Sequence, residues 1–361
     1  MTRGLHASAP GPAALTPAAV LPAPYQTVLK PYGRALADLA RKRPEIVCLT
    51  GDLTRQCEID LFQEEFGDRF IHAGMAEANM IGVAGALARS GLIPFVHTFG
   101  VFATRRPLDQ IINAVAYPRL PVRIVGFMPG ISSPGGPSHQ AIEDVALMRA
   151  LPGMTVVDVA DATETAQAVA AIADLPGPVY LRLKRGEIPV IFPPSRAFSL
   201  ARAQVLAGEG AGEAGSGTDV ALVASGMMVA PALAAASVLR ASGVRAAVLN
   251  VPVIKPLDTA TVLAAAEAAR VVVTAENHSV IGGLGSAVAE AMAEAGLGRP
   301  LRRTGLADTF AEGALTAPYL FAKYGLTTQH LTDTAWTALG RPGPAPRAPE
   351  AAAQAGEYSP V

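Results

Sequence analysis

The first half of the chain alternates short, continuously apolar runs with segments of helical periodicity. EIVCLTG (45–51), LIPFVHTF (92–99), VRIVGF (122–127) and PVYLRL (178–183) are apolar almost throughout. Such runs are typical of parallel strands covered by helices on both faces. The intervening patterns predict helices at residues 34–41, 76–90, 108–115, 140–150 and 163–173. We therefore expect one α/β domain over residues 25–192.

A second α/β pattern follows a cluster of prolines. Pro189, Pro193 and Pro194 indicate a linker at 193–200, and the apolar runs DVALVAS, AAVLNV and ARVVVTAEN then alternate with Ala-rich helices. This pattern predicts a smaller domain with a mainly parallel sheet over residues 201–340. We interpret the Gly-rich stretch at 208–218 as a hairpin tip, because no Lys-Ser/Thr pair follows it. The Pro/Ala-rich segments 1–24 and 341–361 are expected to be a disordered leader and tail.

Composition narrows the functional classes. The chain has 361 residues, of which 50% are hydrophobic and 16% charged, so two packed domains are expected and global disorder is excluded. A net charge of −1 without runs of Lys or Arg provides no electrostatic attraction for nucleic acid or anionic lipid. Cys48 and Cys57 lack companions at metal-ligand spacing, which indicates neither disulfides nor zinc and fits a cytoplasmic protein.

Two segments resemble membrane or targeting signals only superficially. The uncharged stretch 220–239 is interrupted at Ser225-Gly226 and continues as an Ala-rich pattern with Pro231 near its start. We interpret it as a strand followed by a helix rather than a membrane span. The five prolines of residues 1–24 leave no signal-peptide core. We expect no membrane association.

The richest candidate for chemistry is RFIHAGMAEANMIGVAGALARSG (69–91). A strand is expected to end near Gly74, and a helix then places Glu77 in its first turn. Taken alone, a carboxylate there complements the positive end of the helix dipole. The later IGGLGSA motif lacks the third glycine and the acidic residue of a dinucleotide site, so NAD binding is not expected.

Several motifs in order resemble one enzyme family. GMAEANMIGVAGALARSGLIPFVHTFGVFATRRPLDQI, SHQAIEDVALMRALPGMTVV and YLRLKRGEIP resemble the pyrimidine-binding domain of transketolase. AENHSVIGGLGSAVAE resembles the C-terminal domain of the same family, and the similarity covers about residues 28–340. The resemblance implies a thiamine diphosphate-dependent enzyme that transfers a two-carbon ketol unit from a ketose or ketose phosphate to an aldehyde.

A missing motif implies a partner chain. The family's diphosphate-binding domain carries GDG followed by Asn, whereas the only similar string here, Gly51-Asp52-Leu53, lies in the wrong domain. The chain thus resembles the C-terminal subunit of a two-component transketolase. An N-terminal subunit would hold the diphosphate and Mg²⁺, most simply in an α2β2 assembly, and no metal ligands are assigned in this chain.

The resemblance also assigns roles to residues. Glu77 would bind N1′ of the aminopyrimidine, favouring the tautomer through which the cofactor's own exocyclic nitrogen deprotonates the thiazolium C2. Phe99 and Phe102 would stack on the ring. His139 would face the substrate as a hydrogen-bonding or proton-transfer group. Three cationic side chains complete the set: Arg105 beside the cofactor pocket, and Arg185 and Lys30 toward a sugar phosphate.

One departure affects specificity. Met128 stands where the family usually has His, and the loop 129–137 (PGISSPGGP) has no carboxylate where the family has a GED-type loop. Losing these polar contacts is expected to relax or redirect substrate choice.

Other functions remain open. A β subunit of a 2-oxoacid dehydrogenase, a fragment related to 1-deoxyxylulose 5-phosphate synthase and a biosynthetic ketol transferase share these domains. A non-catalytic scaffold subunit, or a metabolite-binding Rossmann-like protein acting as a lone chain, would represent other classes.

Overall fold

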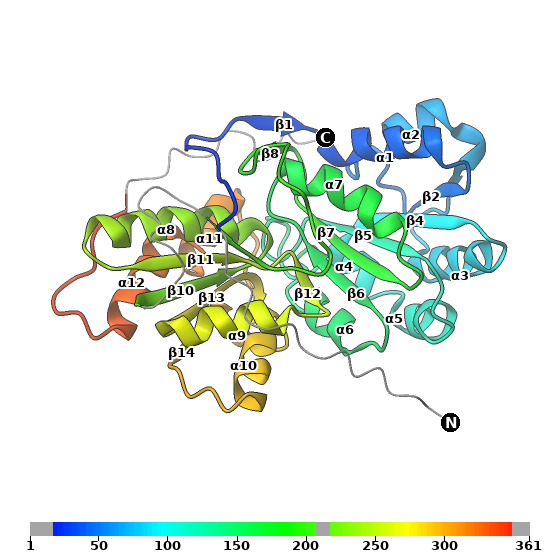
Figure 1. Ribbon diagram of the computed structural model, residues 1–361. Coiled ribbons are helices and arrows are strands. Elements are labelled where there is room, and N and C mark those ends of the chain that lie inside the picture. Colours follow the sequence, from blue (N-terminus) through cyan, green and yellow to red (C-terminus); the bar gives the residue numbers. More distant parts are fainter. Residues whose placement is uncertain (1–16, 207–216, 349–361) are drawn as a thin grey trace, which may run out of the picture.

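The first domain is built on a seven-stranded sheet. The computed structural model describes residues 17–206 and 217–348 and confirms two α/β domains (Figure 1). The strand order is β12-β6-β7-β5-β4-β2-β3, parallel except for β12, which runs antiparallel to β6. The strands are β2 (Ile46–Thr50), β3 (Phe70–His72), β4 (Ile93–Phe99), β5 (Arg123–Phe127), β6 (Thr155–Asp158), β7 (Val179–Leu183) and β12 (Val253–Lys255).

Helices cover both faces of this sheet, as the continuously apolar strands predict. One face carries α1 (Pro31–Lys42), α2 (Asp60–Glu65) and α7 (Ala162–Ala173). The other carries α3 (Glu77–Arg89), α5 (Leu108–Gln110), the π-helix η2 (Ile111–Ala116) and α6 (Asp144–Ala150). The short helix α4 (Gly100–Thr104) follows β4 directly, and the 3₁₀ turn η1 (Gly67–Arg69) precedes β3.

A close approach between helices fixes α3. A Cβ at Gly85 would lie 2.6 Å from the Ala114 carbonyl oxygen, so only glycine allows α3 to pack directly on the backbone of η2. This contact holds the helix whose first residue is Glu77.

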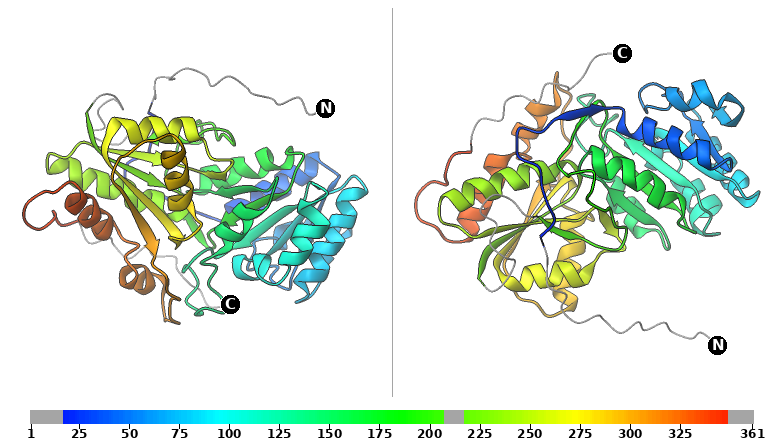
Figure 2. Two further views of the ribbon diagram at one scale, coloured as in Figure 1. Left: turned by 90° about the horizontal axis from the view of Figure 1, so that it is seen from below. Right: turned by 45° about the horizontal axis from the view of Figure 1, so that its top comes forward.

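The second domain contains a five-stranded sheet of order β14-β13-β10-β11-β9. Its strands are β9 (Gln204–Leu206), β10 (Thr218–Ala224), β11 (Ala246–Asn250), β13 (Ala269–Ser279) and β14 (Leu301–Leu306). One face carries α8 (Val229–Ala241), α11 (Ala317–Lys323) and α12 (Thr328–Ala338), and the other α9 (Thr259–Ala268) and α10 (Leu284–Glu294) (Figure 2). The interpretation of 220–239 is confirmed: β10 is followed by the 3₁₀ turn η3 (Gly226–Met228) and α8. Among the described residues no helix has the length and apolar character to span a bilayer.

The predicted hairpin around the Gly-rich stretch is wrong. β9 pairs antiparallel with β11, not with β10. β10 already has parallel neighbours on both edges, β11 and β13, so it has no edge left to pair with β9. The connecting residues 207–216 lie outside the described residues.

Parts of both terminal segments form hydrogen bonds with the folded domains. The Ala18 amide donates to Val205 O (2.8 Å) and the Leu21 amide to Ile191 O (2.8 Å). At the other end, the Ala348 amide donates to Gln329 Oε1 at 2.8 Å. Residues 17–24 thus contact both domains, and the end of 341–348 contacts α12. Residues 1–16 and 349–361 lie outside the described part of the chain.

The second domain contributes one strand to the sheet of the first domain. β12 comes from the sequence of the second domain, yet it extends the sheet of the first by pairing with β6. The predicted linker 193–200 falls between β8 (Glu187–Pro189) and β9. Within it, Arg196 forms an ion pair with Glu164 of α7 at 3.1 Å.

Candidate active site

The predicted site residues gather at the carboxyl edge of the first sheet. Glu77 opens α3 shortly after β3, and Phe99 is the last residue of β4. Met128 directly follows β5, and Arg185 follows β7 by two residues. Ligands of open parallel sheets bind at this edge, because the loops there converge.

Glu77 is a buried carboxylate with one engaged oxygen. Its side chain is only 3% exposed, and Oε1 accepts a hydrogen bond from Arg106 Nη1 at 2.8 Å. Oε2 accepts none from the residues that the structure describes. The position at the first turn of α3 adds the positive end of the helix dipole. One oxygen thus remains available for an external donor.

Two aromatic rings are linked to this carboxylate through Arg106. Phe99 and Phe102 are half-buried and stack with ring centroids 6.1 Å apart and planes inclined by 21°. Arg106 Cζ lies 4.1 Å from the centroid of Phe102, on the ring face. Arg106 was not among the site residues predicted from the sequence. Its signal was the spacing of four from Phe102, which brings side chains together across one helical turn.

His139 packs against the ring of Phe102. Its ring meets Phe102 edge-on, with centroids 5.3 Å apart, and Nδ1 lies 2.9 Å from Ser138 Oγ. His139 is exposed. The structure thus brings together Glu77, Phe99, Phe102 and His139, as the sequence predicts for one site.

Arg105 contacts the loop of His139 rather than the aromatic pair. It donates to Pro137 O at 2.8 Å and to Gln140 O at 3.0 Å, and it forms an ion pair with Glu143. The hydrogen bonds to Glu143 raise the pKa of Arg105. A guanidinium occupied in this way is suited to holding the loop, and the place beside the cofactor pocket that the resemblance implies for Arg105 stays a prediction.

The cations expected at a substrate phosphate meet at one end of a small ribbon. β1 (Thr27–Leu29) pairs antiparallel with β8, with Leu29 opposite Glu187. Lys30 follows β1 and Arg185 precedes β8, so both lie at the same end. Lys30 forms an ion pair with Asp60, whereas Arg185 has no hydrogen bond or ion pair with another described residue.

A buried acid lies close to these cations. Burial raises the pKa of Glu58 to about 7, while the amides of Gly33 and Tyr32 and the charge of Lys30 oppose the rise. Gly33 N donates to Glu58 Oε2 at 3.3 Å, and Oε1 is buried without a hydrogen-bond partner among the described residues. The first turn of α1 is therefore capped by a carboxyl group rather than left open.

Comparison with known proteins decides the family. Residues 26–190 match the family described as transketolase, pyrimidine binding domain, and residues 210–331 match transketolase, C-terminal domain. The chain belongs to the transketolase family.

Individual relatives of this transketolase-family chain cover most of its length. A putative uncharacterized transketolase family protein of Sinorhizobium fredii is 45% identical over 82% of this chain and 85% of its own. A 6-deoxy-6-sulfo-D-fructose transketolase subunit of Clostridium sp. is 44% identical over 84% and 92%. A split gene transketolase, solved as an inactive β4 tetramer, is 42% identical with a TM-score of 0.77, covering 86% of this chain and 97% of its own.

Transketolase membership implies dependence on thiamine diphosphate, and the residues present fit its aminopyrimidine. Glu77 Oε2 has no donor in the described part of the chain, and the rings of Phe99 and Phe102 are only partly covered. No group of three or more His, Cys, Asp or Glu that could hold a metal ion occurs within 17–206 and 217–348.

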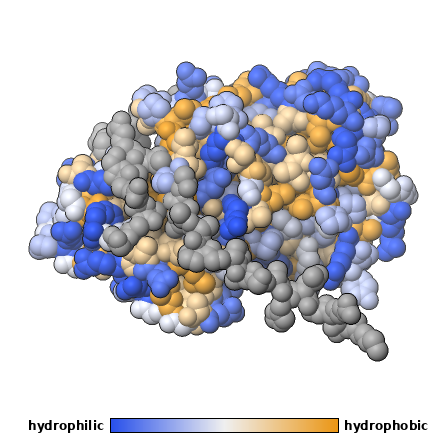
Figure 3. Space-filling view, in the orientation of Figure 1, coloured by the Kyte–Doolittle hydropathy of each residue, from blue (hydrophilic) through white to orange (hydrophobic). Residues whose placement is uncertain are grey.

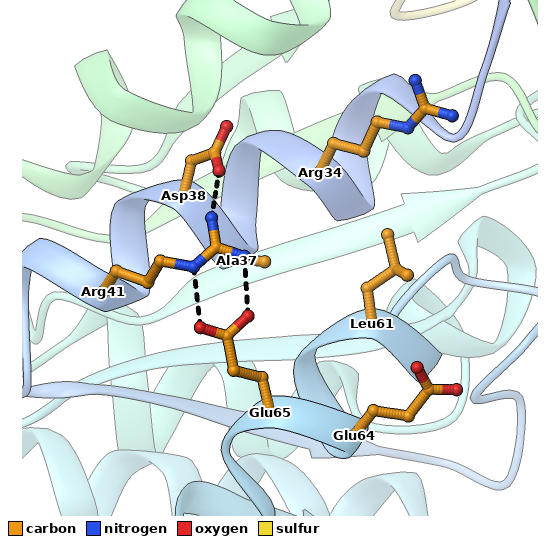
Figure 4. Close-up of a pocket in the computed structure, with 7 residues that line it drawn as sticks. All are labelled: Arg34, Ala37, Asp38, Arg41, Leu61, Glu64 and Glu65. Atoms are coloured by element: carbon orange, nitrogen blue, oxygen red, sulfur yellow. Dashed lines mark hydrogen bonds and ion pairs between the residues drawn. The ribbon is translucent and has the colours of Figure 1, made fainter.

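One surface hollow of this transketolase chain is separate from the site. It has a volume of about 390 Å³ and lies between α1 and α2, where Arg41 forms ion pairs with Glu65 (2.6 Å) and Asp38 (Figure 4). None of the predicted site residues lines it. Its charged groups largely satisfy one another, so we assign it no ligand.

Proposed function

We propose that this chain is the catalytic C-terminal subunit of a two-component transketolase. It would transfer a two-carbon ketol unit from a ketose or ketose phosphate to an aldehyde, and it would be active only with an N-terminal partner, in an α2β2 complex. The partner would carry the diphosphate-binding domain and the ligands of Mg²⁺. The single observation that carries the proposal is the buried Glu77, which has one oxygen without a donor among the described residues and is linked through Arg106 to the Phe99–Phe102 stack.

Each residue has a role in this proposal. Thiamine diphosphate, when bound, supplies the carbon that carries the ketol unit. Glu77 Oε2 would accept a hydrogen bond from its aminopyrimidine, and the two phenyl rings would flank that heterocycle. His139, exposed above Phe102, would bind substrate hydroxyls or move a proton there.

Exposed apolar side chains support a partner chain. Met75, two residues before Glu77, is 78% exposed, and Tyr117 at the end of η2 is 88% exposed. Figure 3 shows apolar and polar residues interspersed on the face it presents. Large exposed apolar groups are typical of surfaces that a partner covers. Cys48 and Cys57 are buried, free thiols, which supports a reducing, cytoplasmic location.

The substrate would carry an anionic terminal group. Arg185, at the end of the β1–β8 ribbon, has no hydrogen-bond or ion-pair partner within residues 17–206 and 217–348, and Lys30 lies at the same end of the ribbon. A guanidinium fork suits phosphate or sulfonate oxygens. One relative is named for a sulfonated ketose, 6-deoxy-6-sulfo-D-fructose, which illustrates such a group. Met128, buried and apolar, would leave one of the usual polar contacts unmade.

The test begins with the partner. The tagged chain is isolated from its native cells with thiamine diphosphate and Mg²⁺ present, and co-purifying chains are identified by mass spectrometry. We expect a stoichiometric companion with GDG and a downstream Asn. The complex is then assayed for ketol transfer, with Glu77→Gln and the exposed Glu294→Gln as matched variants.

The outcomes separate the alternatives. Loss of turnover in Glu77→Gln, with partner binding retained and Glu294→Gln active, supports the proposal. Undiminished activity of Glu77→Gln would contradict it. Release of CO₂ from pyruvate would favour a 2-oxoacid dehydrogenase or a synthase of the deoxyxylulose type. A lone chain that binds no thiamine diphosphate would favour a scaffold.

A further inference from the structure

The loop that departs from the family pattern is bound by the second domain. Asn277, near the end of β13, donates from Nδ2 to Pro129 O at 2.9 Å and accepts from the Ile131 amide on Oδ1 at 3.0 Å. Its carboxamide therefore pairs with a carbonyl and an amide of the same loop, as a peptide group would. Asn277 is 2% exposed, so no water competes for these bonds.

The loop backbone around these two contacts adopts an unusual conformation. Met128 and Gly130 have φ of 55° and 56°, in the left-handed region. A Cβ at Gly130 would collide with Asn277 Oδ1 and with the Asn277 carbonyl oxygen. The loop therefore contacts Asn277 directly, and this contact requires glycine at position 130.

Asn277 is itself fixed from the first domain. Its backbone oxygen accepts from Arg182 Nη2 at 3.0 Å. Arg182 is buried between Asp144 and Asp158, at 2.8 and 2.9 Å. A buried ion cluster at the domain boundary thus determines where the carboxamide lies.

The far end of the loop is also attached to the second domain. Gln140 Nε2 donates to Ser133 O and to Glu312 O, both at 3.1 Å. The Ala314 amide donates to Pro134 O at 2.9 Å. His139 lies between these attachments, so its place above Phe102 depends on how the second domain holds the loop.

We propose that Asn277 is a positioning residue that holds the loop 128–140 and thereby sets the substrate contact of His139. The second domain then contributes to substrate recognition through its hold on this loop. The catalytic part of this inference rests on the proposed function, whereas the holding of the loop does not.

The test replaces the amide by an isosteric acid. Asn277→Asp removes the donor to Pro129 O and places a carboxylate oxygen against that carbonyl. Gln329→Glu is the matched control, because Gln329 also spans a carbonyl and an amide, donating to Pro346 O (3.2 Å) and accepting from Ala348 N, on α12. Hydrogen exchange of residues 128–140 and of α1 is measured in the full chain, and kcat and KM in the reconstituted complex.

We expect Asn277→Asp to speed exchange in 128–140 at least tenfold, with α1 unchanged, and to lower kcat/KM for the donor at least tenfold without weakening thiamine diphosphate binding. The control Gln329→Glu should change neither the hydrogen exchange of these two regions nor the kinetics. Unchanged exchange in a folded Asn277→Asp chain would overturn the inference, as would faster exchange with unaltered kinetics. If Asn277→Asp does not fold, Asn277→Ala is measured in the same way. If the wild-type complex shows no ketol transfer, the proposed function fails, while the exchange data still decide whether Asn277 holds the loop.

Discussion

Arg106 Nη1 lies 2.8 Å from Glu77 Oε1 while the same guanidinium covers the face of Phe102. The two members of this ion pair differ in environment, since Arg106 is 49% exposed and Glu77 is 3% exposed. Arg106 therefore fixes the plane of a buried carboxylate from the solvent side and leaves Oε2 free. It links the acid and the aromatic ring of the candidate site into one unit.

We predict that Arg106→Ala lowers kcat of the reconstituted complex roughly tenfold to a hundredfold, because a charge-assisted hydrogen bond contributes about 1.5–3 kcal/mol. Arg106→Lys should retain part of the activity, since it keeps the charge but loses the fork. Steady-state kinetics with saturating thiamine diphosphate measure the effect. Arg302→Ala is the control, because Arg302 is exposed and contacts only a neighbouring carbonyl. An unchanged kcat for Arg106→Ala would show that Glu77 needs no such orientation.

Substrate charge gives a second prediction. Arg185→Met should raise KM for a phosphorylated or sulfonated substrate roughly tenfold or more and leave KM for its uncharged analogue nearly unchanged. Lys30→Met should have a smaller effect, because Asp60 already neutralises Lys30. The KM values of paired charged and neutral substrates are compared, with the exposed Arg202→Met as control. Equal changes for both substrates would assign Arg185 a structural role instead.

Glu58 gives a pH-dependent prediction. Its pKa is about 7 in the folded chain, against an ordinary value of 4.5, because burial disfavours the charged form. The folded state therefore keeps its proton between these values while the unfolded state has lost it. Glu58 therefore contributes roughly 3 kcal/mol to the free energy of unfolding below about pH 4.5. This contribution is lost as the pH rises through 7.

Glu58→Gln keeps an acceptor for the Gly33 amide and cannot ionise. We expect it to resemble the wild type at pH 5 and to be more stable at pH 8, as measured by urea unfolding. Glu294→Gln, an exposed change, should follow the wild type at both values. If wild type and Glu58→Gln lose stability in parallel from pH 5 to 8, Glu58 is not the titrating group.

Local sequence patterns predicted the elements of the site but not how they combine. The helix predicted at 76–90 is α3 at Glu77–Arg89, because the turn at Gly74 and the helical pattern agree. The register of β1 with β8, which brings Lys30 to the end where Arg185 lies, depends on pairing across the chain that no local pattern carries. Arg106 was missed for a related reason. Two adjacent arginines look alike in sequence, and only the packed structure sends Arg105 to Glu143 and Arg106 to Glu77.

The sequence also gave no indication that β12 of the second domain joins the sheet of the first. Val253–Lys255 is three residues long, and nothing in VIK indicates which sheet it joins. In the structure it pairs with β6, and Lys255 Nζ donates to Arg149 O at 2.7 Å and to Leu151 O, at the end of α6. The second domain thus completes the first at this edge.

This link predicts that the chain unfolds as one unit. Lys255→Met should lower the free energy of unfolding by about 1–2 kcal/mol, because carbonyls at the end of α6 lose a charged donor. Calorimetry should show a single transition shifted down by several degrees, with the protection of α6 and of β13 from hydrogen exchange lowered together. Lys42→Met, at the last residue of α1, is the control. Two separate transitions, with only α6 affected by Lys255→Met, would show that β12 does not couple the unfolding of the two domains.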